Sequence, residues 1–159
     1  MSLHTNIPRV AMQVSRGVVV ASIQVDLDDD VLVQFRQDLL GRVHGTGSRG
    51  VILDVSGLDT LDSEEFAELR RIVTMASLLG AESVLVGLRP GIVSSLIETG
   101  ADVEGLRAAI DLDAAFALLQ PEPESEPELE RESEAEAEGE ADHEESLSLE
   151  SQWAPGDER

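Results

Sequence analysis

The chain has 159 residues and carries 33 acidic side chains against 11 basic ones, a formal net charge of −22 at pH 7. Such an acidic protein repels phosphate backbones and anionic headgroups, so we expect no nucleic-acid and no membrane partner. Cysteine and lysine are both absent, which excludes disulfides, thiolate chemistry and every lysine-dependent mechanism. The amino terminus lacks a signal-peptide pattern and no apolar run approaches the ~18 residues of a membrane span, so we expect a cytoplasmic protein.

Composition divides the chain after Gln120. Residues 121–159 contain 16 acids and two arginines, a net charge of −14, which leaves −8 for residues 1–120. Glutamate occupies every even position from Glu122 to Glu140, without apolar partners that could bury one face. We therefore predict one folded domain over 1–120 and a disordered Glu/Pro/Ser-rich acidic tail over 121–159.

The first half of the domain predicts a hairpin followed by a helix. Weak alternation over 10–15 and the β-branched run VVVASIQV over 18–25 favour two strands. Three aspartates at 28–30 then offer N-caps for a helix that ends near the glycine-rich stretch GTGSRG at 45–50. Its apolar residues recur every three or four positions, at Leu32, Phe35, Leu39 and Val43.

The centre of the domain predicts a strand, a helix and a second strand. VILDV at 51–55 and SVLVGL at 83–88 are typical of buried strands. Between them lies a helix from about Ser63 to Leu79, with one apolar face made by Phe66, Leu69, Val73 and Ala76.

The remaining segments predict a third helix over 89–100, with Pro90 in its first turn and Gly100 as its stop. A short strand near 106–110 and a last helix over 111–119, capped by Asp111 or Asp113, follow. Alternating strands and helices with short connections predict an α/β domain. We expect a mixed sheet of about four to five strands packed against about four helices.

Three known kinds of phosphate- or cation-binding site match this sequence poorly. GTGSRG resembles a phosphate-binding loop, but a Walker loop opens a helix with Gly-Lys-Ser/Thr, whereas Gly50 opens a strand. Asp54 and the aspartates at 28–30 could share Mg²⁺ and accept a phosphoryl group, as in a receiver domain. Receivers also use a lysine, which this chain lacks. A receiver domain remains a rival interpretation. The carboxylates of the tail form no cage for a cation.

Catalysis by a serine is also disfavoured. The histidines are His4, His44 and His143, none close in sequence to Ser63, and this serine does not stand in a G-x-S-x-G elbow. We therefore predict no enzymatic activity, no metal site and no cofactor.

The helix start DTLDSEEFAELRR at 59–71 admits two interpretations. If Asp62 is the N-cap, Glu65 stands at N3 as in a capping box, and Ser63 at N1 keeps a free hydroxyl. If Ser63 is the N-cap, its hydroxyl is tied to the N–H groups of the helix itself.

The same region carries a family resemblance. LDVSGLDTLDS at 53–63 resembles the STAS domain of anti-sigma-factor antagonists. Together with it, four further segments make the chain similar to the RsbS-type stressosome proteins over almost all of 6–119: IPRV at 7–10, SIQVDLDDD at 22–30, VTMASLLGAESVLVGLRPGIVSSLIETGADV at 73–103 and AIDLDAA at 109–115. The resemblance implies a STAS-type fold over 1–120.

The resemblance also implies roles for particular residues. Ser63 corresponds to the phosphorylated residue, with Asp62 before it, and Asp62, Glu64 and Glu65 become candidates for partner binding beside the phosphosite. Glu64 and Glu65 depart from the family, whose members tend to carry small or apolar residues there. Ser95 lies where sensor relatives carry a second phosphorylated threonine, and an ordinary helix-surface serine is the alternative.

The implied function is that of a scaffold in a large cytoplasmic homo- or hetero-oligomeric complex. In such a complex the protein sequesters an RsbT-type serine kinase together with larger RsbR-type STAS sensor proteins, and phosphorylation of Ser63 releases the kinase in a bacterial stress response. About nine residues precede the first predicted strand, which indicates the small partner rather than a sensor. The alternative is a soluble antagonist that binds an anti-sigma kinase directly, without a large assembly.

Overall fold

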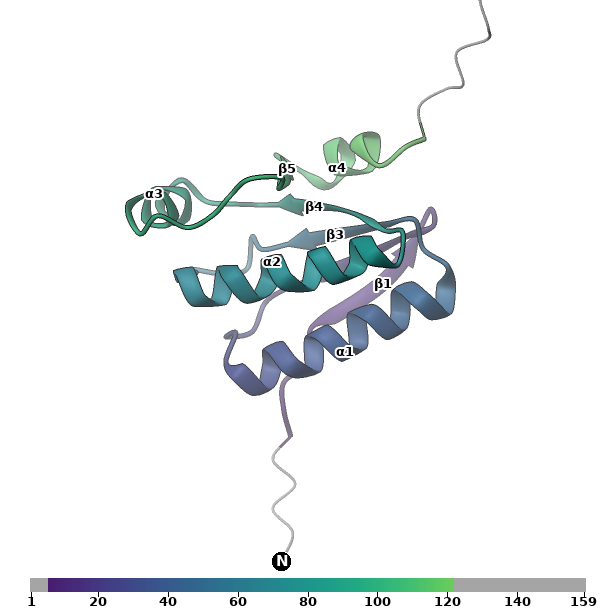
Figure 1. Ribbon diagram of the computed structural model, residues 1–159, viewed down its shortest axis with the longest axis horizontal. Coiled ribbons are helices and arrows are strands. Elements are labelled where there is room, and N and C mark those ends of the chain that lie inside the picture. The colour runs from purple at the N-terminus through teal and green to yellow at the C-terminus, as the bar shows by residue number, and fades with distance from the viewer. Residues whose placement is uncertain (1–5, 122–159) are drawn as a thin grey trace, which may run out of the picture. The chain divides into compact units, whose positions relative to one another are not determined.

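Five strands form one mixed sheet in the order β1-β2-β3-β4-β5, in a computed structural model that describes residues 6–121 (Figure 1). β1 pairs antiparallel with β2, and the other three pairings are parallel. The strands are Ala11–Ser15, Val18–Ser22, Gly50–Asp54, Glu82–Val86 and Arg107–Ala109. The predicted mixed sheet is confirmed, whereas the predicted disordered tail lies outside the described residues.

Within the described residues, four helices accompany the sheet, as predicted. They are α1 (Asp29–Thr46), α2 (Ser63–Leu78), α3 (Pro90–Glu98) and α4 (Leu112–Leu118). α1 and α2 run side by side across one face of the sheet, whereas α4 lies against the other face (Figure 1). The predicted α/β class is therefore correct.

Strand residues alternate between two cores. Val19, Val51 and Leu53 belong to the main core under α1 and α2, whereas their neighbours Val18 and Ile52 pack with α4. Because central strands are buried on both faces, they read in the sequence as unbroken apolar runs rather than as alternating patterns.

β2 and β4 each end at least two residues earlier than predicted. β2 ends at Ser22, although the apolar run continues through Ile23, which is fully buried beyond the strand. β4 ends at Val86 because Gly87 takes a positive φ of 81° and turns the chain out of the sheet. An apolar run marks burial, and burial continues past the point where the backbone leaves its neighbour strand.

The helix ends follow the local signals in the sequence. The Asp28 side chain accepts a hydrogen bond from the Val31 N–H at 2.8 Å at the start of α1, and Gly47, with φ 61°, ends that helix. GTGSRG is thus a helix-ending turn that leads into β3. Asp111, rather than Asp113, caps α4 by accepting from the Ala114 N–H at 2.8 Å.

Gly87 lets two loops approach each other at the carboxyl ends of β3 and β4. A Cβ atom at this position would lie 2.6 Å from the Ser56 Cβ and 2.9 Å from its backbone. Both the positive φ and the contact therefore require glycine. The loop held in this way is the one that leads from β3 to the start of α2.

We predict that Gly87→Ala lowers the free energy of unfolding by more than the ~1–3 kcal/mol that a left-handed backbone costs a non-glycine residue by itself. Gly100→Ala is the matched control, because Gly100 has φ 69° but a Cβ atom there would meet no atom within 4 Å. Urea unfolding of both variants measures the difference. Equal losses would show that the contact with Ser56 is unimportant.

Candidate functional site

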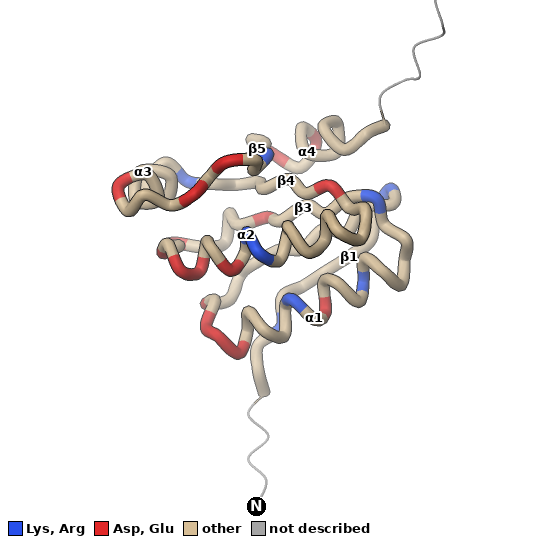
Figure 2. The backbone as a smooth tube through the Cα atoms, viewed as in Figure 1, with Lys and Arg blue, Asp and Glu red and all other residues tan. Residues whose placement is uncertain are grey.

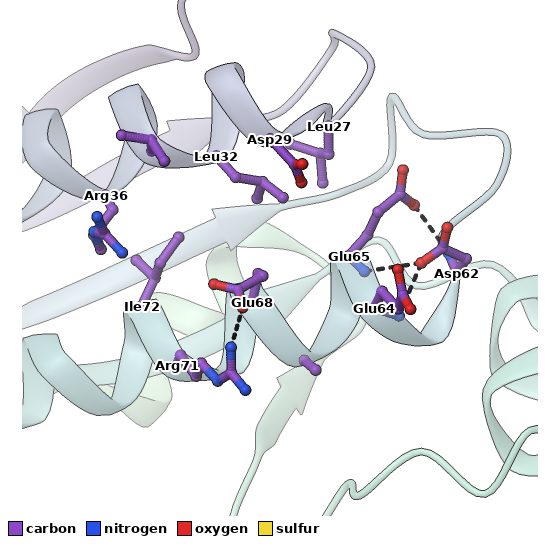
Figure 3. A pocket seen from close by; sticks show the side chains of 12 residues that line it. Leu27, Asp29, Leu32, Arg36, Asp62, Glu64, Glu65, Glu68, Arg71 and Ile72 are labelled. Atoms are coloured by element: carbon purple, nitrogen blue, oxygen red, sulfur yellow. Dashed lines mark hydrogen bonds and ion pairs between the residues drawn. The ribbon is translucent and has the colours of Figure 1, made fainter.

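A reciprocal capping box forms the start of α2. One carboxylate oxygen of Asp62 accepts hydrogen bonds from the N–H groups of Glu64 and Glu65, both at 2.8 Å. The Glu65 side chain accepts in return from the Asp62 N–H at 2.9 Å (Figure 3). Of the two sequence interpretations, the one with Asp62 as N-cap is therefore correct, and Ser63 is the first residue of the helix.

The hydroxyl of Ser63 does not cap the helix. Ser63 is half-buried, and its hydroxyl makes no hydrogen bond with any of residues 6–121. It lines an open depression of about 580 Å³ between α2 and the segment that follows α3. From α2 the depression is lined by Ser63, Phe66, Ala67, Arg70, Arg71, Thr74 and Met75, and from the other side by residues 99–102.

Arg70 holds the far wall of this depression. Its guanidinium pairs with the Asp102 carboxylate and donates to the Glu104 carbonyl at 3.0 Å. The hydrogen bond from Arg70, with a second from the Glu104 N–H, lowers the pKa of Asp102 below its ordinary value of 3.8. Asp102 therefore stays ionised at neutral pH, and the positive charge of Arg70 is already matched.

The surroundings of Ser63 are negative. Asp62 and Glu64 are exposed and Glu65 is half-buried, and all three stand at the start of α2 beside the serine. Figure 2 shows acidic residues gathered at this end of α2. Arg70 and Arg71 lie roughly 10–12 Å further along the helix axis at 1.5 Å per residue. Arg71 is itself paired with Glu68. A phosphate on Ser63 would thus find the positive end of a helix but no unpaired arginine of α2.

Arg89 fixes the loop that leads to Ser63, a role that the sequence does not predict. Its guanidinium donates to the Asp59 carboxylate at 2.8 Å and to the Ser56 carbonyl at 2.9 Å. The two partners lie 30 and 33 residues earlier in the chain. The only signal in the sequence was the Arg-Pro pair at the start of α3, which does not say what the arginine contacts.

Ser95 lies elsewhere. It is exposed on α3 and is not among the residues that line the depression beside Ser63. Its backbone carbonyl accepts from the Thr99 hydroxyl at 2.9 Å, which is an ordinary contact within a helix. The structure therefore does not bring the two candidate phosphorylation sites into one pocket.

The residues of the rival chemistries serve local structure. Asp54 accepts from the Ser56 N–H at 3.0 Å, and Asp28 caps α1. His44 stands in the last turn of α1, about 22 Å along the helix from Asp29, whereas the start of α2 lies beside the start of α1 (Figure 1). Within residues 6–121 no cluster of His, Asp or Glu side chains could hold a metal ion. No helix in this part of the chain is long and apolar enough to span a membrane.

A family model of the STAS domain matches residues 9–111. The chain belongs to the STAS family. The mixed sheet of this chain is that of the STAS fold. The capped start of α2 follows β3 at the carboxyl edge of this sheet.

Two solved STAS structures are similar to this chain at 30% sequence identity. One is a serine-to-glutamate variant of RsbS from Moorella thermoacetica, with a TM-score of 0.60, covering 69% of this chain and 93% of that one. The other is a chain from a structure of the stressosome, which is described as a signal integration and transduction hub. Its TM-score is 0.61, and the match covers 69% of this chain and 95% of that one.

A weaker similarity links the chain to a longer protein. The RsbT co-antagonist protein RsbRD of Bacillus subtilis (strain 168) is 21% identical over 106 residues, which are 67% of this chain. The chain spans 38% of the length of RsbRD.

We predict that Asp62→Ala lowers the free energy of unfolding by about 0.5–2 kcal/mol, because it removes the acceptor for two N–H groups of α2. Ser63→Ala should stay within about 0.5 kcal/mol of the unmodified protein, because the hydroxyl makes no structural hydrogen bond. Asp62→Asn is the control that keeps a capping acceptor. Chemical unfolding measures all three, and an equal loss for Ser63→Ala would mean that this serine has a capping role after all.

Proposed function

We propose that this chain is a cytoplasmic, non-enzymatic scaffold protein of a bacterial stressosome-like complex. It binds an RsbT-type serine kinase together with RsbR-type STAS sensor proteins, and it releases the kinase when Ser63 is phosphorylated. Similarity to RsbS and to the stressosome structure supports the assembly, and similarity to an RsbT co-antagonist supports the choice of kinase. The protein needs no metal or cofactor of its own for this role.

The observation that carries the proposal is the unengaged hydroxyl of Ser63 at the start of a capped helix. In phosphoryl transfer the serine oxygen attacks the γ-phosphorus of ATP, the bond to ADP breaks, and the hydroxyl proton passes to a base of the kinase. An oxygen bound to helix N–H groups would first have to break those hydrogen bonds. Because Asp62 and Glu65 cap α2, Ser63 can react without loss of the helix cap.

The charges around Ser63 explain release. A phosphate adds about −1.5 to −2 charges at neutral pH. The positive end of α2 offsets this by about 0.3–1 kcal/mol, whereas Asp62 and Glu64 oppose it. Since Arg70 and Arg71 already have acidic partners, the phosphate gains no new partner on α2.

Kinase binding and phosphorylation thus compete for the same surface. A bound kinase that covers Ser63 would have to accommodate a desolvated dianion among carboxylates. A 100-fold loss of affinity requires only about 2.7 kcal/mol, which is within the range of one buried charge at an interface. The domain itself need not refold, because none of the capping contacts involves the Ser63 hydroxyl.

We predict that Ser63→Ala binds an RsbT-type kinase as tightly as the unmodified protein, whereas Ser63→Asp binds it about 100-fold more weakly. Isothermal titration calorimetry measures both affinities. Ser77→Asp is the matched control, because Ser77 is an exposed serine near the other end of α2. Tight binding by Ser63→Asp would exclude release by charge, and an equal loss with Ser77→Asp would show a general effect of added charge.

A further inference from the structure

α4 closes the face of the sheet opposite α1 and α2 (Figure 1). Within residues 6–121, the core on this face, here called the second core, consists of strand side chains and of residues from α4 and its C-cap. Its buried strand side chains are at most 4% exposed, and they are Val18, Val20, Ile52, Val84 and Val86. One helix of seven residues therefore keeps water from five aliphatic side chains.

α4 contributes few apolar contacts of its own. Ala115 and, at the C-cap, Leu119 are buried, and Phe116 is partly buried. Leu112 and Leu118 remain 38% and 42% exposed. Because a helix of about two turns is unstable in water by itself, α4 keeps its helical form only while it is docked on the sheet.

Arginines from distant segments bind the carboxyl end of α4. Arg49, just before β3, donates to the Leu119 carbonyl at 3.3 Å, and Arg107 of β5 donates to the Leu118 carbonyl at 2.8 Å. Carbonyls at the end of a helix lack partners in a following turn, and the helix dipole favours cations there. The two arginines thus fasten the end of α4 to the sheet.

Two side-chain contacts complete this fastening. The Arg16 guanidinium, in the turn between β1 and β2, lies 4.9 Å from the centroid of the Phe116 ring. Arg49 donates to the Arg16 carbonyl at 2.7 Å and so supports this turn. Leu119 packs closely on Gly50, where a Cβ atom would lie 2.9 Å from the Leu119 Cδ1.

The fastening is weaker than the packing of the other long helices. α1 and α2 each bury five side chains, whereas α4 buries Ala115 and its C-cap residue. The hydrogen bond from Arg107 is exposed, and that from Arg49 is only partly buried. Elements with few buried apolar contacts and exposed hydrogen bonds open at the lowest free energy.

We propose that α4 is a strap that opens as a unit while the main core stays folded, and that its opening uncovers the apolar face of β2, β3 and β4. Arg49 and Leu119 set the balance between the closed and the open form. Ser63 keeps its place in both forms, because α2 packs on the opposite face of the sheet. The inference involves no kinase and is independent of the proposed function.

Cysteine labelling of the full-length chain tests the strap, because the chain has no cysteine of its own. Val84→Cys places a thiol in the second core, and Val51→Cys places one in the main core. Both valines are fully buried and lie on the neighbouring strands β4 and β3. The reaction of each thiol with a chromogenic disulfide is divided by the rate of the same variant in denaturant, which removes differences in thiol reactivity.

A buried thiol reacts only when its cover opens. We expect the Val84→Cys variant to react at least about tenfold faster than the Val51→Cys variant in the absence of denaturant. Its rate should also rise less steeply with urea, because opening of α4 exposes less surface than global unfolding.

Substitutions in the strap give the matched comparison. Leu119→Ala removes the side chain that packs on Gly50 and should speed the reaction of the Val84→Cys variant at least about tenfold. Arg49→Gln removes the donor to the Leu119 carbonyl and should speed it about threefold or more. Leu118→Ala makes the same change as Leu119→Ala at an exposed neighbouring position, and it should leave the rate unchanged.

Hydrogen exchange of the unsubstituted chain tests the strap without any cysteine. The amides of Ala115 and Leu119 should exchange faster than those of Leu69 and Ile72 in α2, with a weaker dependence on urea. Equal reaction rates of the two thiols, an equal effect of Leu118→Ala, or equal protection of the amides of α4 and α2 would each overturn the proposal.

Discussion

The hydrogen bonds between Asp62 and the first turn of α2 determine what the neighbouring serine can do. Two N–H groups that would otherwise remain unpaired are bound by one carboxylate, and Glu65 completes the box by accepting from Asp62. Asp62 and Glu65 thus cap the helix, and Ser63 between them keeps a hydroxyl that can react. If Ser63 capped the helix itself, every phosphorylation event would also remove a cap; with Asp62 in that position, a change of charge at Ser63 leaves the start of the helix intact.

α2 connects two surfaces with different electrostatic character. Along one face, Ser63 and Arg70 line a depression whose far wall is held by the ion pair between Arg70 and Asp102. Glu64 and Glu68 line the groove shared with α1, and Ala67 and Arg71 line both surfaces.

Local features of this structure were predictable from the sequence, whereas contacts between distant segments were not. The Asp-x-x-Glu spacing predicts the capping box because its partners are three residues apart, and the apolar period of α1 predicts its buried residues Leu32, Phe35, Leu39 and Val43. The apolar pattern places the end of β2 too late because Ile23 is buried beyond the strand. Arg89 bonds to a loop 30 residues earlier, and Arg70 to a carboxylate 32 residues later, so neither pairing has a local sequence signal.

In the proposed function, Ser63 is the residue that a kinase phosphorylates, while Asp62 and Glu65 cap the helix. The most direct test is intact-mass measurement with phosphosite mapping after incubation of the full-length chain with an RsbT-type kinase and ATP. We expect acid-stable phosphate on Ser63. Stable modification of another residue with Ser63 unchanged, or acid-labile phosphate on an aspartate, would contradict it.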